Sequence, residues 1–296
     1  MNDIAAHRAL LDKLYAARVA DDLDGVMSCF AADATAQIAG SPDFCPAAAR
    51  VSGHGDVTAL MKKLIDGWEF IERRELSTVI AHDKAAVHSL VRLRYRDTGQ
   101  MIETELYDLW TMRGDKVAAF VEFADTAMVN HAMAHPAPDQ SAAALRSVAS
   151  GAHAGRVSLQ SIVDDAYAAR IAGDVDDLMA RFLPDAKFRL AGSSDASPGA
   201  MMANGAAEIR PMMEQLCQMW KFLVREQLSL VVDGENVAVH SAIRAKFLPS
   251  NEIVDTEFHE LWTIRDGKIA SLLQFIDTAM VNAVVGRAQA NGFLPK

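Results

Sequence analysis

The chain has 296 residues, 51% of them hydrophobic, so it can bury one large core or two ordinary ones. Its formal net charge is −10 and no cluster of lysine and arginine forms a basic stripe, which disfavours nucleic acid as a partner. The N-terminal segment MNDIAAHRALLDKLY holds acidic residues and no uninterrupted apolar run, so it predicts neither a signal peptide nor a membrane span. We therefore expect a cytoplasmic protein.

The two halves of the chain repeat one another at a fixed offset of 152 residues. The six residues from Asp125 to Asn130 recur unchanged from Asp277 to Asn282, and the YAAR segment that begins at Tyr15 recurs at Tyr167. Each copy is too long to be a unit of a solenoid, so each must carry its own core. The intervening segment is rich in Ala, Ser, Pro and Gly, which is typical of a linker. We predict a first domain over residues 1–133, a linker over 134–156 and a second domain over 157–296.

The first copy opens with apolar residues at helical spacing and continues with alternating, strand-like runs. Asp21 or Asp22 can cap the second helix. In chain order we expect helices over 4–19 and from the cap through Phe30, a strand over 34–38, a loop over 42–52, a helix over 56–66, and strands over 68–80, 85–96, 101–112 and 116–125. Helices followed by a sheet predict an α+β fold.

Turn chemistry predicts how the strands pair. A two-residue hairpin at the Asp97 turn would place Arg92 opposite Glu105, and correspondingly Arg244 opposite Glu257. A three-residue loop in the next hairpin keeps even-numbered residues opposite even-numbered ones. One face then carries two carboxylates on apolar ground, and its members are Val91, Leu93, Tyr95, Leu106, Asp108, Trp110, Phe120 and Glu122. The opposite face carries His88, Arg92, Glu105, Val121 and Phe123.

This order of elements, with the FAADA phrase at Phe30 and a WTIRDGKI-type hairpin before a strand that ends in Asp, resembles the SnoaL-like branch of the NTF2-like superfamily. The resemblance covers nearly all of both copies. It implies two tandem conical domains, each with three helices packed on a curved, mostly antiparallel sheet. It also implies an apolar pocket on the face with the carboxylates and a dimer contact on the other face. The two copies would then pair within one chain.

Activities within this superfamily differ, so each family's functional residues must be carried over singly. The general base of the ketosteroid isomerases would fall at Ile38 and Leu190, which cannot act as bases. Their oxyanion-hole tyrosine would fall near Leu14 and Ala166, whereas the partner acid would match Asp108 and Glu260.

In the limonene epoxide hydrolase pattern, two members of the catalytic triad would fall at Ser89 and Val91, and only the third finds an acid, Glu122. The SnoaL-type cyclases require a single acid/base, for which Glu122 is suitable.

The best catalytic candidates are Glu122 as acid/base and Asp108 as hydrogen-bond donor or orienting group, because adjacent buried carboxylates raise one another's pKa. The alternative is a structural carboxylate hydrogen-bonded to Trp110, Tyr95 or water. The second copy has Glu260 and Gln274 at these positions, so it lacks one titratable group and the first copy is the better catalytic candidate. The expected ligand-binding residues are Tyr15, Trp68, Val91, Tyr95, Trp110, Phe120, Tyr167, Glu260, Trp262 and Gln274.

Other polar residues have simpler explanations. Asp125 and Asp277 can cap the last helix, with a pocket role as the alternative. His131 and His135 have the spacing of a metal pair, but the second copy lacks both and no carboxylate completes the site, so we expect no metal. The three cysteines are odd in number, without ligand spacing, and we interpret them as structural thiols.

The sequence thus predicts a small-molecule pocket protein that needs no cofactor and acts on an apolar, polyketide- or steroid-like ligand by acid/base catalysis. A cyclase, isomerase or hydrolase reaction would fit the family. The alternatives are a binding module without turnover and a structural pseudo-dimer. The expected partner is an apolar small molecule, with no nucleic acid and no membrane.

Overall fold

The computed structural model describes residues 2–136, 159–193 and 200–294. The chain divides into two compact units, residues 1–150 and 151–296, which we call domain 1 and domain 2. Most of the segment predicted as a linker, from residue 137 onward, lies outside the described residues. Each domain is therefore described by itself.

Domain 1 has four helices and one six-stranded sheet among its described residues. Its elements are α1 (Asn2–Val19), α2 (Leu23–Met27), β1 (Phe30–Ile38), β2 (Ala49–Ser52), α3 (His54–Gly67), β3 (Trp68–Ala81), β4 (Lys84–Tyr95), β5 (Met101–Arg113), β6 (Lys116–Phe123) and α4 (Thr126–Ala134).

Domain 2 repeats the same order. Its elements are α5 (Leu159–Ala172), α6 (Val175–Ala180), β7 (Phe182–Leu190), β8 (Met201–Asn204), α7 (Ala206–Met219), β9 (Trp220–Asp233), β10 (Asn236–Phe247), β11 (Glu252–Arg265), β12 (Lys268–Phe275) and α8 (Thr278–Ala290). The last helix is longer than its counterpart, with 13 residues in α8 against 9 in α4.

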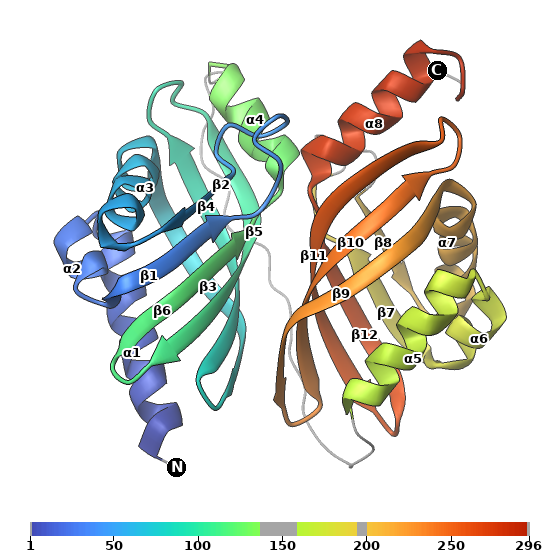
Figure 1. The fold of residues 1–296 in the computed structure, drawn as a ribbon, viewed down its shortest axis with the longest axis horizontal. Helices are drawn as coiled ribbons and strands as arrows, with labels where there is room; N and C mark the ends of the chain where they lie inside the picture. The colour runs from blue at the N-terminus through green and yellow to red at the C-terminus, as the bar shows by residue number, and fades with distance from the viewer. Residues whose placement is uncertain (1, 137–158, 194–199, 295–296) are drawn as a thin grey trace. The chain divides into compact units, whose positions relative to one another are not determined.

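Each sheet is mostly antiparallel, with one parallel pair. The strand order is β2-β1-β6-β5-β4-β3 in domain 1 and β8-β7-β12-β11-β10-β9 in domain 2, and β1 runs parallel to β6 as β7 does to β12. In Figure 1 each sheet is twisted and curved, with its first three helices on the concave side and its last helix across one end. This arrangement confirms the α+β prediction and leaves a concave face on which a pocket can form.

Side-chain caps fix where several helices begin. Asp22 accepts a hydrogen bond from the Gly25 amide at the start of α2, and Asp125 accepts one from the Met128 amide at the start of α4. The N-cap interpretation of Asp125 is therefore confirmed. Asp277 accepts the equivalent bond at the start of α8.

The structure corrects the prediction in two places. The segment expected to be a loop ends in a short strand, β2, and the second helix ends before Phe30, which instead begins β1. The predicted pairing of Arg92 with Glu105 is wrong, because Arg92 lies opposite Glu103 and Leu90 lies opposite Glu105.

The physical reason for the shifted register is a longer turn. The Tyr95 amide donates to the Gln100 carbonyl across a four-residue loop, and the Thr98 hydroxyl in that loop donates to the Ala132 carbonyl at 2.7 Å. A shift of two residues keeps every side chain on its predicted face. In domain 2, Arg244 correspondingly pairs with Asp255 rather than with Glu257.

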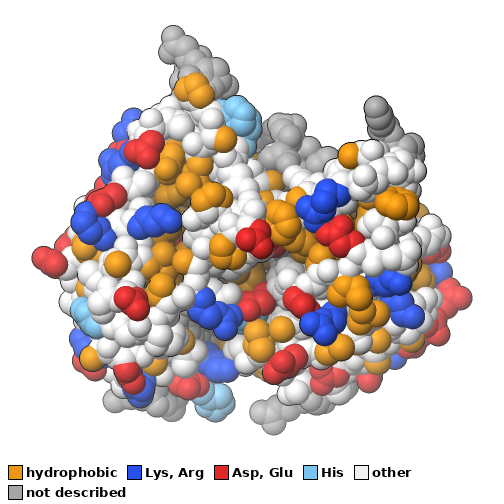
Figure 2. Space-filling model, turned by 45° about the horizontal axis from the view of Figure 1, so that its top comes forward, with side chains coloured by type: hydrophobic (Ala, Val, Ile, Leu, Met, Phe, Trp, Pro, Cys, Tyr) orange, Lys and Arg blue, Asp and Glu red, His pale blue; other side chains and the backbone are white. Residues whose placement is uncertain are grey.

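Within the described part of the chain, no helix combines the length and apolar character needed to cross a bilayer. On the face shown in Figure 2, basic side chains are interspersed with acidic ones, so the described residues there form no continuous basic patch.

Candidate functional site

Two carboxylates lie side by side on the concave face of domain 1. Asp108 on β5 pairs directly with Glu122 on β6, which confirms the predicted register of this hairpin. Because directly opposed residues in an antiparallel pair have neighbouring side chains on one face, the two carboxyl groups are adjacent.

A hydrogen-bond chain holds Asp108 in place. The Trp110 indole N–H donates to the Tyr15 hydroxyl at 3.1 Å, and that hydroxyl donates to Asp108 Oδ2 at 2.5 Å. The Arg73 guanidinium lies over the Tyr15 ring, 3.5 Å from its centroid. Asp108 is 2% exposed, and its Oδ1 has no hydrogen-bond partner among the described residues. The structure therefore presents Asp108 as an acceptor with one oxygen that has no partner among the described residues, which fits the orienting role better than the donor role among the two expected from the sequence.

Glu122 has a different environment. Burial, and then the charge of Asp108, raise the pKa of Glu122 to about 8, although the Arg18 charge opposes this. Burial raises the pKa of Asp108 only to about 6, because the Tyr15 hydrogen bond and the Arg73 charge favour its ionised form. Within the pair, burial and the Asp108 charge therefore favour a proton on Glu122, whereas Tyr15 and Arg73 favour the ionised form of Asp108. Such a pair can donate a proton from one carboxyl and accept one at the other.

The cavity beside this pair is small, about 70 Å³. Its walls include several predicted ligand residues, namely Tyr15, Trp68, Asp108, Trp110, Phe120 and Glu122. Val91 and Tyr95 do not line it. Val91 is completely buried in the core, and Tyr95 packs on Trp68 while its hydroxyl donates to Asp97.

The corresponding polar group in domain 2 is a single carboxylate with its hydrogen bonds made. Gln274 donates to Glu260 Oε1 at 2.7 Å, and the Trp262 indole N–H donates to Glu260 Oε2 at 3.2 Å. Burial raises the pKa of Glu260, and these bonds act in the opposite direction by favouring the charged form. Gln274 cannot titrate, so domain 2 has no acid pair at this position.

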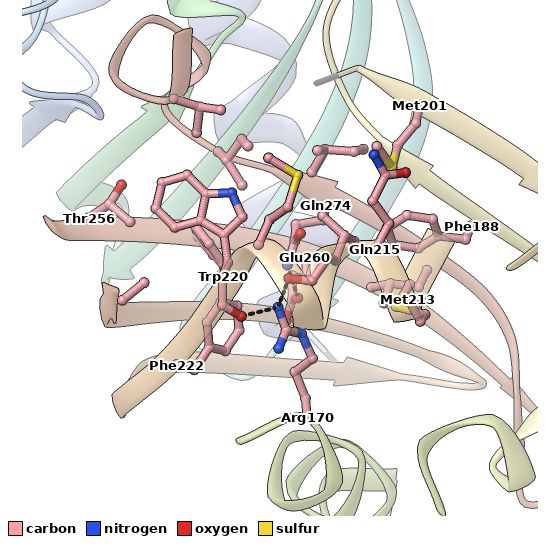
Figure 3. Close-up of a pocket in the computed structure, with 18 of the residues that line it drawn as sticks. Arg170, Phe188, Met201, Met213, Gln215, Trp220, Phe222, Thr256, Glu260 and Gln274 are labelled. Carbon is pink, nitrogen blue, oxygen red and sulfur yellow. Dashed lines mark hydrogen bonds between the residues drawn. The ribbon is translucent and has the colours of Figure 1, made fainter. Parts of the chain in front are cut away.

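The cavity of domain 2 is far larger, about 370 Å³. Figure 3 shows side chains from the helices and the sheet around it, with Glu260 and Gln274 near the middle of the view. Most of the lining is apolar or aromatic, and it includes Tyr167, Phe188, Met201, Met213, Trp220, Phe222, Phe258 and Trp262. The helix α8 closes one side with Met280, Val281 and Val285.

Side-chain size accounts for much of the difference between the two cavities. Leu14 and Leu93 of domain 1 are replaced at the equivalent positions of domain 2 by Ala166 and Ala245, all four of them buried. Phe120 is likewise replaced by Leu272. Some changes act in the opposite direction, because Phe258 stands where domain 1 has a leucine, but the net result is a roomier pocket in domain 2.

A loop also narrows the cavity in domain 1. Cys45 is 1% exposed and packs with Trp68 and Val129, and the Asn130 amide donates to the Phe44 carbonyl. This loop is therefore tied to α4 over the cavity, which leaves little space beneath it.

Sequence reasoning missed the arginines of both sites. Arg18 and Arg73 line the cavity of domain 1, and Arg170 lines that of domain 2. The Arg225 guanidinium lies 3.9 Å from the centroid of the Tyr167 ring, as Arg73 does over Tyr15. The repeat carried the signal, because both arginines of each copy recur at the same offset.

The remaining polar candidates lie elsewhere. His88 Nε2 is 2.6 Å from Glu105, and His240 Nε2 is 2.8 Å from Glu257, in matching places on the opposite face of each sheet. His131 and His135 stack with ring centroids 4.4 Å apart. Among the residues that the structure describes, no cluster of His, Cys, Asp or Glu could hold a metal ion.

The profile of the SnoaL-like domain matches this chain twice, over residues 11–120 and 163–272. The chain belongs to the SnoaL-like domain family. The two matched segments are displaced by the same offset as the internal repeat, so each SnoaL-like copy corresponds to one of the two compact units. No curated protein matches the sequence.

Solved structures of NTF2-like proteins are similar to single copies of this SnoaL-like tandem. An NTF2-like protein from Burkholderia xenovorans has 22% identity, covers 43% of this chain and 95% of its own, and has a TM-score of 0.37. An NTF2-like protein of unknown function from Burkholderia pseudomallei has 14% identity, coverages of 44% and 98%, and a TM-score of 0.39. A protein with a ketosteroid isomerase-like fold from Catenulispora acidiphila, crystallised with trimethylamine, has 13% identity, coverages of 43% and 93%, and a TM-score of 0.37.

Proposed function

We propose that domain 2 binds an apolar small molecule in its cavity. The observation that carries this proposal is the volume of about 370 Å³, enclosed by aromatic and aliphatic side chains with a few polar groups. Pockets that bury a small organic ligand commonly measure roughly 300 to 1,000 Å³ and have this kind of lining. A flat polycyclic molecule of polyketide or steroid type suits the size and the aromatic walls.

Polar groups in the cavity wall can orient a ligand. Glu260 and Gln274 form a hydrogen-bonded pair in otherwise apolar surroundings, and Thr256 of β11 and Gln215 of α7 add further hydrogen-bonding groups (Figure 3). A ligand with one polar substituent can align that substituent with one of these groups while its apolar body displaces water from the walls. We expect such binding to need no chemical step.

Ligand capture followed by native mass spectrometry tests this function. The wild-type chain is incubated with a library of neutral steroids and aromatic polyketides, beside the double variant Ala166→Leu with Ala245→Leu. These substitutions restore the leucines of domain 1 and fill the cavity without introducing polar groups. We expect capture by the wild type and at least roughly tenfold weaker capture by the variant. Equal capture by both proteins would show that the ligand binds elsewhere.

A second function, acid/base catalysis in domain 1, is favoured by one specific observation. Glu122 has a raised pKa and adjoins Asp108, whose Oδ1 is buried without a partner among the described residues. A protonated acid beside an ionised carboxylate is the arrangement that proton transfer to and from a substrate requires. The cavity of about 70 Å³ admits only a small reacting group, so a larger substrate would require domain 1 to open.

Conversion of a captured compound distinguishes the two functions. We expect Glu122→Gln to abolish any conversion while capture persists, and the matched Glu260→Gln change in domain 2 to leave conversion intact. Conversion that survives Glu122→Gln would remove the catalytic role from domain 1.

A further inference from the structure

Arg170 is a cation in the wall of the domain 2 cavity. It lies near the end of α5, and its Nη2 donates to the backbone carbonyls of Leu216 at 3.3 Å and Trp220 at 3.2 Å (Figure 3). The guanidinium stacks on Phe222, with its central carbon 4.2 Å from the ring centroid. Neither Nε nor Nη1 donates a hydrogen bond to any described residue. Two donor groups of this arginine therefore remain available.

The equivalent arginine of domain 1 has the same frame but a different charge environment. Arg18 donates to the carbonyls of Leu64 and Trp68 and stacks on Phe70. It also lies 3.4 Å from Asp21 and is close enough to Glu122 for that charge to favour its protonated form. Arg18 is thus surrounded by acids of its own domain.

Domain 2 has neither of these acids at the equivalent positions. Gly173 occupies the position of Asp21, and Gln274 occupies the position of Glu122. Within residues 159–193 and 200–294, no carboxylate forms an ion pair with Arg170. Glu260 does not substitute for them, because it forms no hydrogen bond or ion pair with Arg170 and its charge is not among those that act on that arginine.

A buried guanidinium without a counter-ion is unfavourable. Burial lowers the pKa of Arg170, because it keeps the charge away from water. Charges in such places are normally paired, and a planar guanidinium pairs best with a carboxylate or a similar oxyanion. The cavity therefore contains a site that an anion from outside the chain would complete.

We propose that the ligand of domain 2 is an apolar anion, a carboxylate, sulfonate or ionised enol, whose negative group binds Arg170 while its hydrocarbon body fills the cavity. This inference rests on the proposed binding function and adds the charge class of the ligand. It assigns the anionic group of the ligand to Arg170, whereas Glu260 and Gln274 remain hydrogen-bonding groups of the same cavity.

A matched pair of fluorescent dyes tests the charge separately from binding itself. Anilinonaphthalene sulfonate is anionic, whereas N-phenylnaphthylamine has the same aromatic body without the sulfonate. Both are titrated into the wild type, Arg170→Gln, Arg170→Lys, and Arg18→Gln as the matched control in domain 1. The double variant Ala166→Leu with Ala245→Leu serves as the filled-cavity reference.

We expect Arg170→Gln to lower the affinity for the sulfonate dye by roughly ten- to a hundredfold and to leave the affinity for the neutral dye unchanged. Arg170→Lys keeps the positive charge and should retain most of the affinity for the sulfonate dye. Arg18→Gln should change the affinity for neither dye. Equal affinity of the sulfonate for wild type and Arg170→Gln would overturn the inference while leaving the binding function in place. Loss of both dyes in Arg170→Gln and in Arg170→Lys would show a purely structural arginine and also overturn it. If the variant Ala166→Leu with Ala245→Leu bound both dyes as tightly as the wild type does, that result would instead contradict the proposed function.

Discussion

Domain 1 and domain 2 share one fold and differ at the positions that decide what a pocket can do. Domain 1 has two adjacent carboxylates and a cavity of about 70 Å³, whereas domain 2 has one satisfied carboxylate and a cavity of about 370 Å³. The two acids that domain 2 lacks, at the positions of Asp21 and Glu122, are the acids whose charges act on Arg18 in domain 1. The comparison teaches that two copies of one fold can carry an acid pair in one copy and a large cavity in the other. A small number of residues in the cavity wall determines each property.

The largest expected effect concerns the packing difference. Leu14→Ala in domain 1 removes a side chain that is 3% exposed, so it should lower the stability of that domain by about 2 to 5 kcal/mol. The reverse change in domain 2, Ala166→Leu, adds volume beside an existing cavity and should cost less than about 1.5 kcal/mol. Hydrogen exchange resolved at the level of peptides from each domain measures the loss of stability caused by each substitution. Similar losses in the two domains would mean that the cavity volumes do not reflect these side chains.

The second effect is the pH dependence that the raised pKa of Glu122 gives to domain 1. The folded-state pKa of Glu122 is raised from 4.5 to about 8, so between these values the folded state binds a proton that the unfolded state has released. The stability of domain 1 should therefore be highest at low pH within this window and fall as pH rises towards about 8, by on the order of 3 kcal/mol.

Glu122→Gln is the control for that dependence, because it cannot titrate. The variant should have a flatter profile of exchange protection between about pH 5 and 8, and at pH 8 it should be more stable than the wild type. A wild-type profile that rises with pH would contradict the raised pKa of Glu122.

Features that depend on interactions between residues close in the sequence could be predicted, whereas features that depend on distant residues could not. The repeat, the helix caps and the pairing of Asp108 with Glu122 depend on short spacings and turn chemistry, and all three are confirmed. The pairing of Arg92 was wrong because the loop between the two strands holds four residues rather than the two that its sequence suggested, and the equivalent loop of domain 2 makes the same shift.

The site was harder to predict than the fold. Alternation placed Asp108 on the pocket face, but the Tyr15 hydroxyl that orients it comes from a helix 93 residues earlier. Cavity volume depends on the sum of side-chain sizes on several elements, so the sequence favoured domain 1 as the site from its acids alone. The significance of Arg170 emerged only when its contacts could be compared with those of Arg18.

The smallest expected effect distinguishes the two corrected strand pairs. Arg244 makes two bonds of 2.8 and 2.9 Å to Asp255, whereas Arg92 approaches Glu103 only to 3.9 Å. Double-mutant cycles should give a small favourable coupling for the exposed pair in domain 2 and none that can be measured for the pair in domain 1. A larger coupling for Arg92 with Glu105 would restore the register predicted from the sequence.

Hydrogen exchange with and without a captured ligand tests the central claim most directly, because it reports which copy holds the ligand. We predict that protection on binding appears in peptides from α7, β11 and α8, which line the larger cavity, and that the filled-cavity variant Ala166→Leu with Ala245→Leu loses it. Protection confined to peptides from α1, β5 and β6, beside Asp108 and Glu122, would contradict the assignment of ligand binding to domain 2.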